Sequence, residues 1–142
     1  MKKRMSKLFA VAMVLVMVLS VAALTTSCGG TKTLEDYVNG DKEVSKQLND
    51  AGEQFSNDAM KAEVIVKENT LTYAYTYTDT YTKEQTKKMV PLFEKALEGY
   101  TATYEGIRDN LEKESEIEGV VVKITYYNGD GSEIYTKTYE KK

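Results

Sequence analysis

The sequence predicts a two-layer α+β domain in which one long helix packs across a four-stranded, mainly antiparallel sheet, in the order α-ββ-α-ββ. Three stretches carry this prediction. Residues 70–78 alternate threonine or alanine with leucine or tyrosine, which is the period of a half-buried strand. Residues 83–114 place apolar side chains at steps of three and four, as an amphipathic helix does. Residues 128–131 read Asn-Gly-Asp-Gly, a hairpin signal between two strand-like runs.

Two short helices are expected before the first strand. Thr33 is a candidate N-cap, with Asp36 three residues later in the position of a capping box. Gly40 ends this helix, and Asp41 then caps a second one whose inward face includes Leu48.

The first hairpin is expected to join residues 62–67 to residues 70–78 through a tight turn at Glu68 and Asn69, because Asn tolerates the left-handed conformation. We expect the tyrosine face of the second strand to pack under the long helix and the threonine face to stay exposed. On an open face the tyrosines could instead stack on sugar rings. The two faces are Leu71, Tyr73, Tyr75 and Tyr77 on one side, and Thr70, Thr72, Ala74, Thr76 and Thr78 on the other.

The long helix is expected to begin at a capping box formed by Thr82 and Gln85. Pro91 lacks an amide hydrogen, so we expect a kink there or a helix that restarts there. The acidic run 112–118 opposes the helix dipole and predicts a frayed end. The two remaining strands are expected at residues 120–127 and 132–139.

Residues 1–27 have the pattern of a bacterial secretory signal, in which basic residues precede the almost unbroken apolar run 8–24. The stretch Leu24–Cys28 resembles the lipobox of lipoproteins, although Thr25 stands where Leu is most usual. That resemblance implies diacylglyceryl transfer to the Cys28 sulfur, cleavage before Cys28 and an anchor on the outer face of the cytoplasmic membrane. A retained transmembrane helix and a soluble secreted protein are the alternatives, since a run of 17 residues, apolar except for Ser20, reaches the lower limit for spanning a bilayer.

Cleavage would leave 115 residues, in which residues 28–32 form a lipidated tether and residues 33–142 a single domain. This part of the chain has 15 basic and 22 acidic residues, a formal net charge of −7. Such scattered negative charge argues against a nucleic-acid partner, which would need a basic patch.

The chain contains no His and a single Cys. Triads built on Ser-His or Cys-His are therefore excluded, as are the usual zinc, copper and iron sites. Residues 128–133 suggest a calcium loop, but the EF-hand spacing would put ligands on Tyr126 and Lys137. We expect no catalytic residue, no cofactor and no metal, and hence no enzyme. Two of the four carboxylates in the run 112–118 could still form the acid–base pair of a glycosidase, although a charge run is usually a solvated surface. The four are Glu112, Glu114, Glu116 and Glu118.

Four motifs occur in order along the chain, at Thr33–Val38, Asn69–Tyr75, Gly119–Lys123 and Tyr127–Gly131. They resemble the small lipoproteins of Gram-positive, clostridia-like bacteria catalogued as domain of unknown function 4854. The resemblance implies the same order of elements and an envelope location. It implies no activity and no catalytic residues, because the family has none assigned.

The sequence therefore favours a lipid-anchored, non-enzymatic binding module for an envelope protein or a wall polysaccharide. Its membrane contact would be the lipid on Cys28, and Thr72 and Thr76 are the candidate binding surface. The alternative is a small-ligand carrier or sensor with a tyrosine-lined pocket between helix and sheet. A sheet edge that accepts a partner strand is a further possibility.

Overall fold

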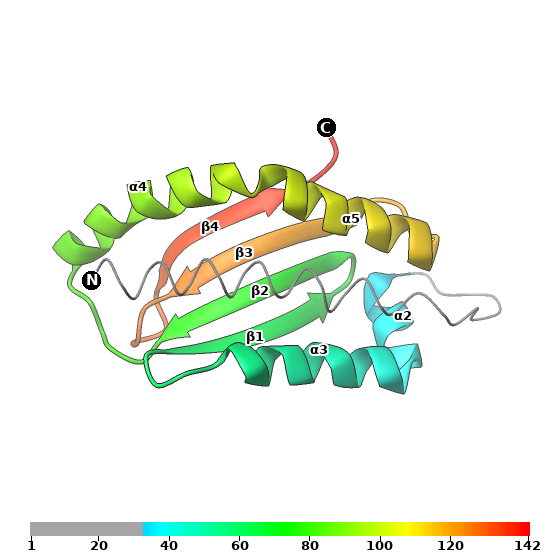
Figure 1. Cartoon of the computed structure of the whole chain (residues 1–142), viewed down its shortest axis with the longest axis horizontal. Helices are drawn as coiled ribbons and strands as arrows, with labels where there is room; N and C mark the ends of the chain where they lie inside the picture. The colour runs from blue at the N-terminus through cyan, green and yellow to red at the C-terminus, as the bar shows by residue number, and fades with distance from the viewer. Residues whose placement is uncertain (1–32) are drawn as a thin grey trace.

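The computed structural model describes residues 33–142, so the predicted signal, the lipidated Cys28 and the tether lie outside the described residues. The described residues form four helices beside one four-stranded sheet, arranged as in Figure 1. Within this part of the chain, no helix combines the length and the apolar character needed to cross a bilayer. The elements are α2 (Leu34–Gly40), α3 (Lys42–Phe55), β1 (Met60–Lys67), β2 (Thr70–Tyr77), α4 (Lys83–Gly99), α5 (Thr101–Ser115), β3 (Val121–Tyr127) and β4 (Glu133–Tyr139).

The sheet has the order β1-β2-β3-β4. β1 pairs with β2, and β3 with β4, as antiparallel hairpins. β2 and β3 pair in parallel, because the chain leaves β2 and crosses back through α4 and α5 before β3 begins. The predicted α+β class and four-stranded sheet are confirmed, whereas the parallel pairing at the centre was not predicted.

The prediction of one long helix is wrong, because the segment is divided at Tyr100 into α4 and α5. Tyr100 has φ −106° and ψ 11°, and its amide donates to the Leu97 carbonyl, which closes α4 with a tight final turn. Pro91 lies inside α4 and ends no helix. Its ring faces solvent, where a helix tolerates a missing amide hydrogen bond. Gly99, a poor helix former, precedes the break.

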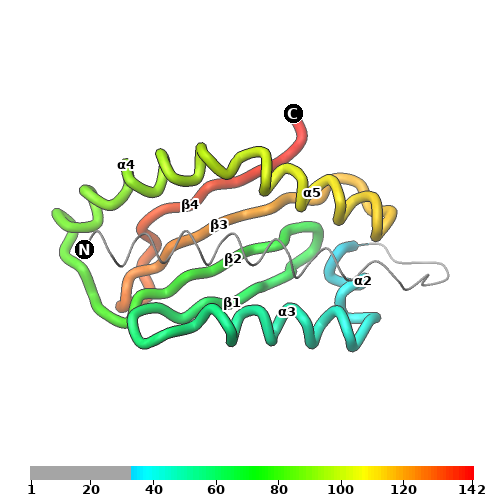
Figure 2. Tube along the Cα trace, viewed as in Figure 1, coloured from blue at the N-terminus to red at the C-terminus, as the bar shows by residue number. Residues whose placement is uncertain are grey.

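All the helices pack on one face of the sheet, which we call the inner face. Figure 2 shows α3 running along β1 and α4 along β4, with β2 and β3 between them. Phe93 of α4 stacks on Tyr126 of β3, with ring centroids 4.1 Å apart, and Phe55 of α3 belongs to the same core. The inner residues of β2 are buried, which confirms that its tyrosine face is covered.

α3 approaches β1 closely at Gly52. A Cβ atom added at Gly52 would lie 3.1 Å from the Ala62 carbonyl oxygen. One turn later the Ser56 hydroxyl donates to the Gly52 carbonyl and accepts from the Ala62 amide, at 2.9 and 3.0 Å. Ser56 therefore provides a hydrogen-bond partner for one backbone amide on the free edge of β1. A partner strand could no longer use this amide, which makes the edge less suited to strand addition.

The turn between β1 and β2 differs from the prediction in one residue. Glu68, with φ 52°, takes the left-handed conformation that was expected of Asn69. The Asn69 side chain instead accepts from the Leu34 amide at 3.0 Å and donates to the Glu118 carbonyl at 3.4 Å. It thus ties the hairpin to α2 and to the segment before β3.

The predicted hairpin turn between β3 and β4 is confirmed, and Asn128 is buried there. Its Oδ1 accepts from the Tyr81 amide and its Nδ2 donates to the Tyr81 carbonyl, both at 2.8 Å. A Cβ atom added at Gly129 would lie 2.7 Å from the Asp79 carbonyl group. The loop before α4 is therefore fixed to the β3–β4 turn.

Candidate functional site

The sheet face turned away from the helices is the first candidate site, and we call it the outer face. The threonine face of β2 was predicted to stay exposed, but Thr72 and Thr76, the predicted binding residues, are both half-buried, and Ala74 between them is buried. The two threonines lie about 13 Å apart along β2. Thr72 lies between Ile65 and Lys123 in the sheet register. The outer face comprises Lys61, Glu63, Ile65 and Lys67 of β1, Thr70, Thr72, Ala74 and Thr76 of β2, Val121, Lys123, Thr125 and Tyr127 of β3, and Glu133, Thr136 and Thr138 of β4.

This outer face is rich in hydroxyls and positive in charge. Three lysines and two glutamates give it a formal charge of +1. Lys61 pairs with Glu63 at 3.0 Å, while Lys67 and Lys123 form no ion pair within the described residues. The face therefore has the opposite sign to the predicted mature chain, which suits contact with an anionic, hydrogen-bonding partner.

The inner face of β2 is the second candidate site. The hydroxyls of Tyr73, Tyr75 and Tyr77 are buried and have no hydrogen-bond partner among residues 33–142. Burial is the largest cause that raises the pKa of each of these phenols, so all three remain protonated near neutral pH. Sequence reasoning placed these tyrosines in the core but gave no sign that their hydroxyls would lack partners.

Each tyrosine ring of this inner cluster has an aromatic neighbour. Tyr75 stacks on Tyr126 at 5.3 Å, and Phe93 stacks on the same Tyr126. The Tyr73 ring is tilted by 52° against that of Tyr104 in α5, with the ring centroids 6.1 Å apart. Stacking on sugar rings needs an open ring face, so this arrangement does not fit the sugar-platform alternative.

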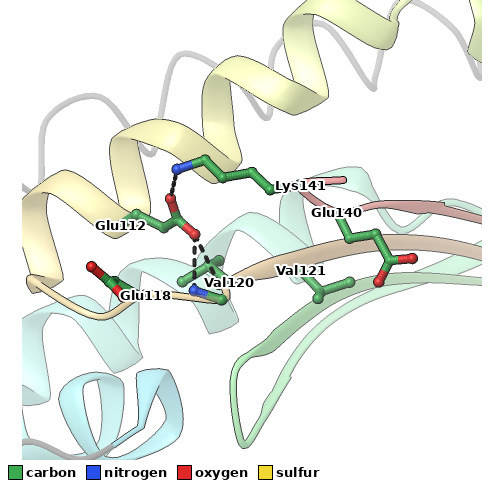
Figure 3. A pocket seen from close by; sticks show the side chains of 7 residues that line it. Glu112, Glu118, Val120, Val121, Glu140 and Lys141 are labelled. Carbon is green, nitrogen blue, oxygen red and sulfur yellow. Dashed lines mark hydrogen bonds and ion pairs between the residues drawn. The ribbon is translucent and has the colours of Figure 1, made fainter.

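The third candidate is a surface pocket of about 340 Å³ where β3 begins and β4 ends (Figure 3). Glu112 of α5 accepts from the amides of Gly119 and Val120, at 3.0 and 3.2 Å, and pairs with Lys141. The hydrogen bond from Lys141 is the largest cause that lowers the pKa of Glu112. The lining residues are Glu112, Glu118, Gly119, Val120, Val121, Glu140 and Lys141.

This arrangement is poorly suited to acid–base catalysis. A glycosidase acid needs a raised pKa, whereas that of Glu112 is lowered and its oxygens are already bonded. Figure 3 shows the carboxylates of Glu118 and Glu140 at opposite ends of the pocket, pointing apart. Within residues 33–142, no group of three or more acidic, His or Cys side chains could hold a metal ion.

Comparisons with known proteins give a family and a fold. A family model described as "Domain of unknown function (DUF4854)" matches residues 34–139. No curated protein matches the chain. A solved structure described as a "putative secreted protein" from Pseudomonas aeruginosa is similar, with a TM-score of 0.51 and 10% sequence identity. The match covers 78% of this chain and 95% of that chain, and at this identity it shows a shared fold.

Proposed function

The chain belongs to the family described as Domain of unknown function (DUF4854), whose description assigns no activity, so we propose its role from its surfaces. We propose that it is a non-enzymatic binding module, anchored outside the cytoplasm by a lipid on Cys28. The signal-like pattern before Cys28 supports the location. So does the similarity to a protein described as secreted. Two acyl chains, at about 0.8 kcal/mol per buried CH₂, would hold the domain stably at the membrane.

One observation carries the binding role: the outer face bears no helix of the described chain and is positively charged. Lys67 and Lys123 have ammonium groups without an ion-pair partner in that region, and the threonines beside them offer donors and acceptors. An anionic wall polymer supplies the complementary charge and oxygens. We therefore favour such a polymer over an envelope protein as the partner.

The test is sedimentation of the mature chain with isolated cell-wall fragments, before and after mild acid removes their anionic polymers. Binding should be lost after the acid treatment and should weaken as salt rises, because exposed charges are screened. Lys67→Glu with Lys123→Glu should abolish binding, and Thr72→Val with Thr76→Val should weaken it. The control pair Lys87→Glu and Lys95→Glu makes the same change in net charge on exposed positions of α4.

Binding that survives the acid treatment, or that both lysine pairs affect equally, would contradict an anionic polymer on the outer face. Capture of one envelope protein by in-cell crosslinking through outer-face positions would identify the other partner class instead.

A second candidate function is carriage of a small ligand between the helices and the sheet. The specific observation that favours it is the set of buried, unpartnered hydroxyls on β2.

A further inference from the structure

Three tyrosine hydroxyls form a regular row on the inner face of β2. Tyr73, Tyr75 and Tyr77 occupy alternate positions of one strand, so their side chains leave the same face about 7 Å apart. Each hydroxyl oxygen is buried, and none has a donor or acceptor among residues 33–142. The row is thus a repeated arrangement of the same polar group.

Tight packing of aromatic rings does not account for this row. Phenylalanine would supply the same rings without burying a polar group, and buried hydroxyls in proteins nearly always have a partner. Tyr139 shows the usual outcome in the same core, since its hydroxyl donates to the Leu97 carbonyl at 2.9 Å. The three hydroxyls on β2 therefore call for a partner from outside the described residues.

The surrounding elements leave the row between two groups of helices. α3 packs mainly on β1, α4 on β4, and α5 on β3 and β4, whereas the main contacts of β2 are with the neighbouring strands (Figure 2). The hydroxyls project from β2 on the same side as these helices. A molecule that reaches them would lie along β2, with α3 on one side and α4 and α5 on the other.

The chemistry of the row defines its ligand. Each ring of the row already has an aromatic neighbour, in a tilted, stacked or edge-to-face arrangement, so the hydroxyl groups are what this row can offer a further molecule. The phenols are donors in an aromatic and aliphatic core, which disfavours a charged group. We infer that the hydroxyls of Tyr73, Tyr75 and Tyr77 bind an uncharged, elongated, largely apolar molecule that carries hydrogen-bond-accepting oxygens, such as an ester or a ketone. This inference rests on the second candidate function.

The test uses the full mature chain, residues 28–142, with Cys28→Ser so that no acyl chain competes. The probe is Nile red, an uncharged elongated ketone whose fluorescence rises in an apolar site. At least one of Tyr73→Phe, Tyr75→Phe and Tyr77→Phe should weaken binding about fivefold, the effect of losing the hydrogen bond to the single ketone oxygen, and the triple variant should weaken it by about the same factor. 1-Monooleoylglycerol should displace the probe, and oleate should not.

The control is Tyr127→Phe, which removes a hydroxyl from the outer face and should leave the affinity unchanged. Urea unfolding checks that each variant is folded, and the single variants keep the test valid if the triple variant is not. Unchanged affinity in the folded Phe variants would overturn the proposal and leave buried water as the partner of the hydroxyls. Lys67→Glu with Lys123→Glu should not change the affinity for Nile red. Failure of the tyrosine-row proposal can therefore be told apart from failure of the wall-polymer proposal.

Discussion

At the scale of single residues, buried polar side chains decide how the loops are fixed. Asn128 exchanges two hydrogen bonds with the backbone of Tyr81, 47 residues earlier, and accepts a third from the Gly129 amide at 3.1 Å. Asn69 makes similar long-range bonds to α2 and to the segment before β3. The sequence marks both as turn residues, because Asn favours turns, but local pattern cannot reveal partners so distant in the chain.

Asn128→Ala should lower the free energy of unfolding by about 2–3 kcal/mol, because it leaves the amide and carbonyl of the half-buried Tyr81 without their side-chain partners. The measurement is the urea midpoint. Asn110→Ala, at an exposed position of α5, should change stability by less than about 0.5 kcal/mol. Equal effects of the two substitutions would show that the bonds of Asn128 contribute nothing.

Removing the hydroxyl group should change the free energy of unfolding in opposite directions at two tyrosines of the core. Tyr73→Phe removes a buried hydroxyl with no partner in the described chain, and should stabilise the ligand-free protein by about 1 kcal/mol. Tyr139→Phe removes the donor to the Leu97 carbonyl and should destabilise by about 1 kcal/mol. Thermal unfolding of the two variants side by side checks this, and a loss of stability in Tyr73→Phe would show that its hydroxyl is satisfied without ligand.

At the scale of elements, local signals predicted how helices and hairpins begin better than where helices end. The Thr82 capping box is present, with Gln85 bonding back to the Thr82 amide at 2.9 Å. The division at Tyr100 was missed because the apolar spacing continues across it, from Leu97 to Tyr104. Gly99 and Gly106 lie where a Cβ atom added to either would meet nothing within 4 Å. The close contact is at Gly52.

These glycines give a matched test on two helices. Gly52→Ala should destabilise by about 1–3 kcal/mol, because its Cβ would press on the β1 backbone at Ala62. Gly106→Ala should stabilise by about 0.5–1 kcal/mol, because α5 gains a better helix former in open space. Urea titrations of both variants check this, and a stabilised Gly52→Ala variant would contradict the close approach of α3 to β1.

At the scale of the whole molecule, the sequence predicted the class and the number of strands but not how the two hairpins join. The inward tyrosines of β2 could be assigned to the core from their period of two, and they are buried. The direction in which β2 meets β3 depends on the path of α4 and α5, which a pattern within one strand does not contain. The charge of the outer face was missed for the same reason, since Lys67 and Lys123 come to share a face only when the sheet assembles.

Stability of the whole domain should depend on pH through Glu112, which links α5, the start of β3 and the C-terminal segment. Its pKa is lower in the folded protein than the ordinary 4.5, so its contribution is present above pH 4.5 and is lost as pH falls through the folded pKa. Glu112→Gln should unfold at a lower urea concentration at pH 7 and show a shallower acid dependence. Glu114→Gln removes an equal charge from an exposed position and should retain the wild-type dependence.

The parallel pairing of β2 with β3 also has a consequence for how fast the protein folds. Each antiparallel hairpin closes a short loop, a process of microseconds, but β2 can reach β3 only after the 43 residues between Tyr77 and Val121 have been ordered or looped out. Closing so long a segment is entropically unfavourable, and such distant contacts slow folding. We expect the meeting of the two hairpins to be the rate-limiting event, so that substitutions along the β2–β3 seam slow refolding while those in either turn mainly speed unfolding.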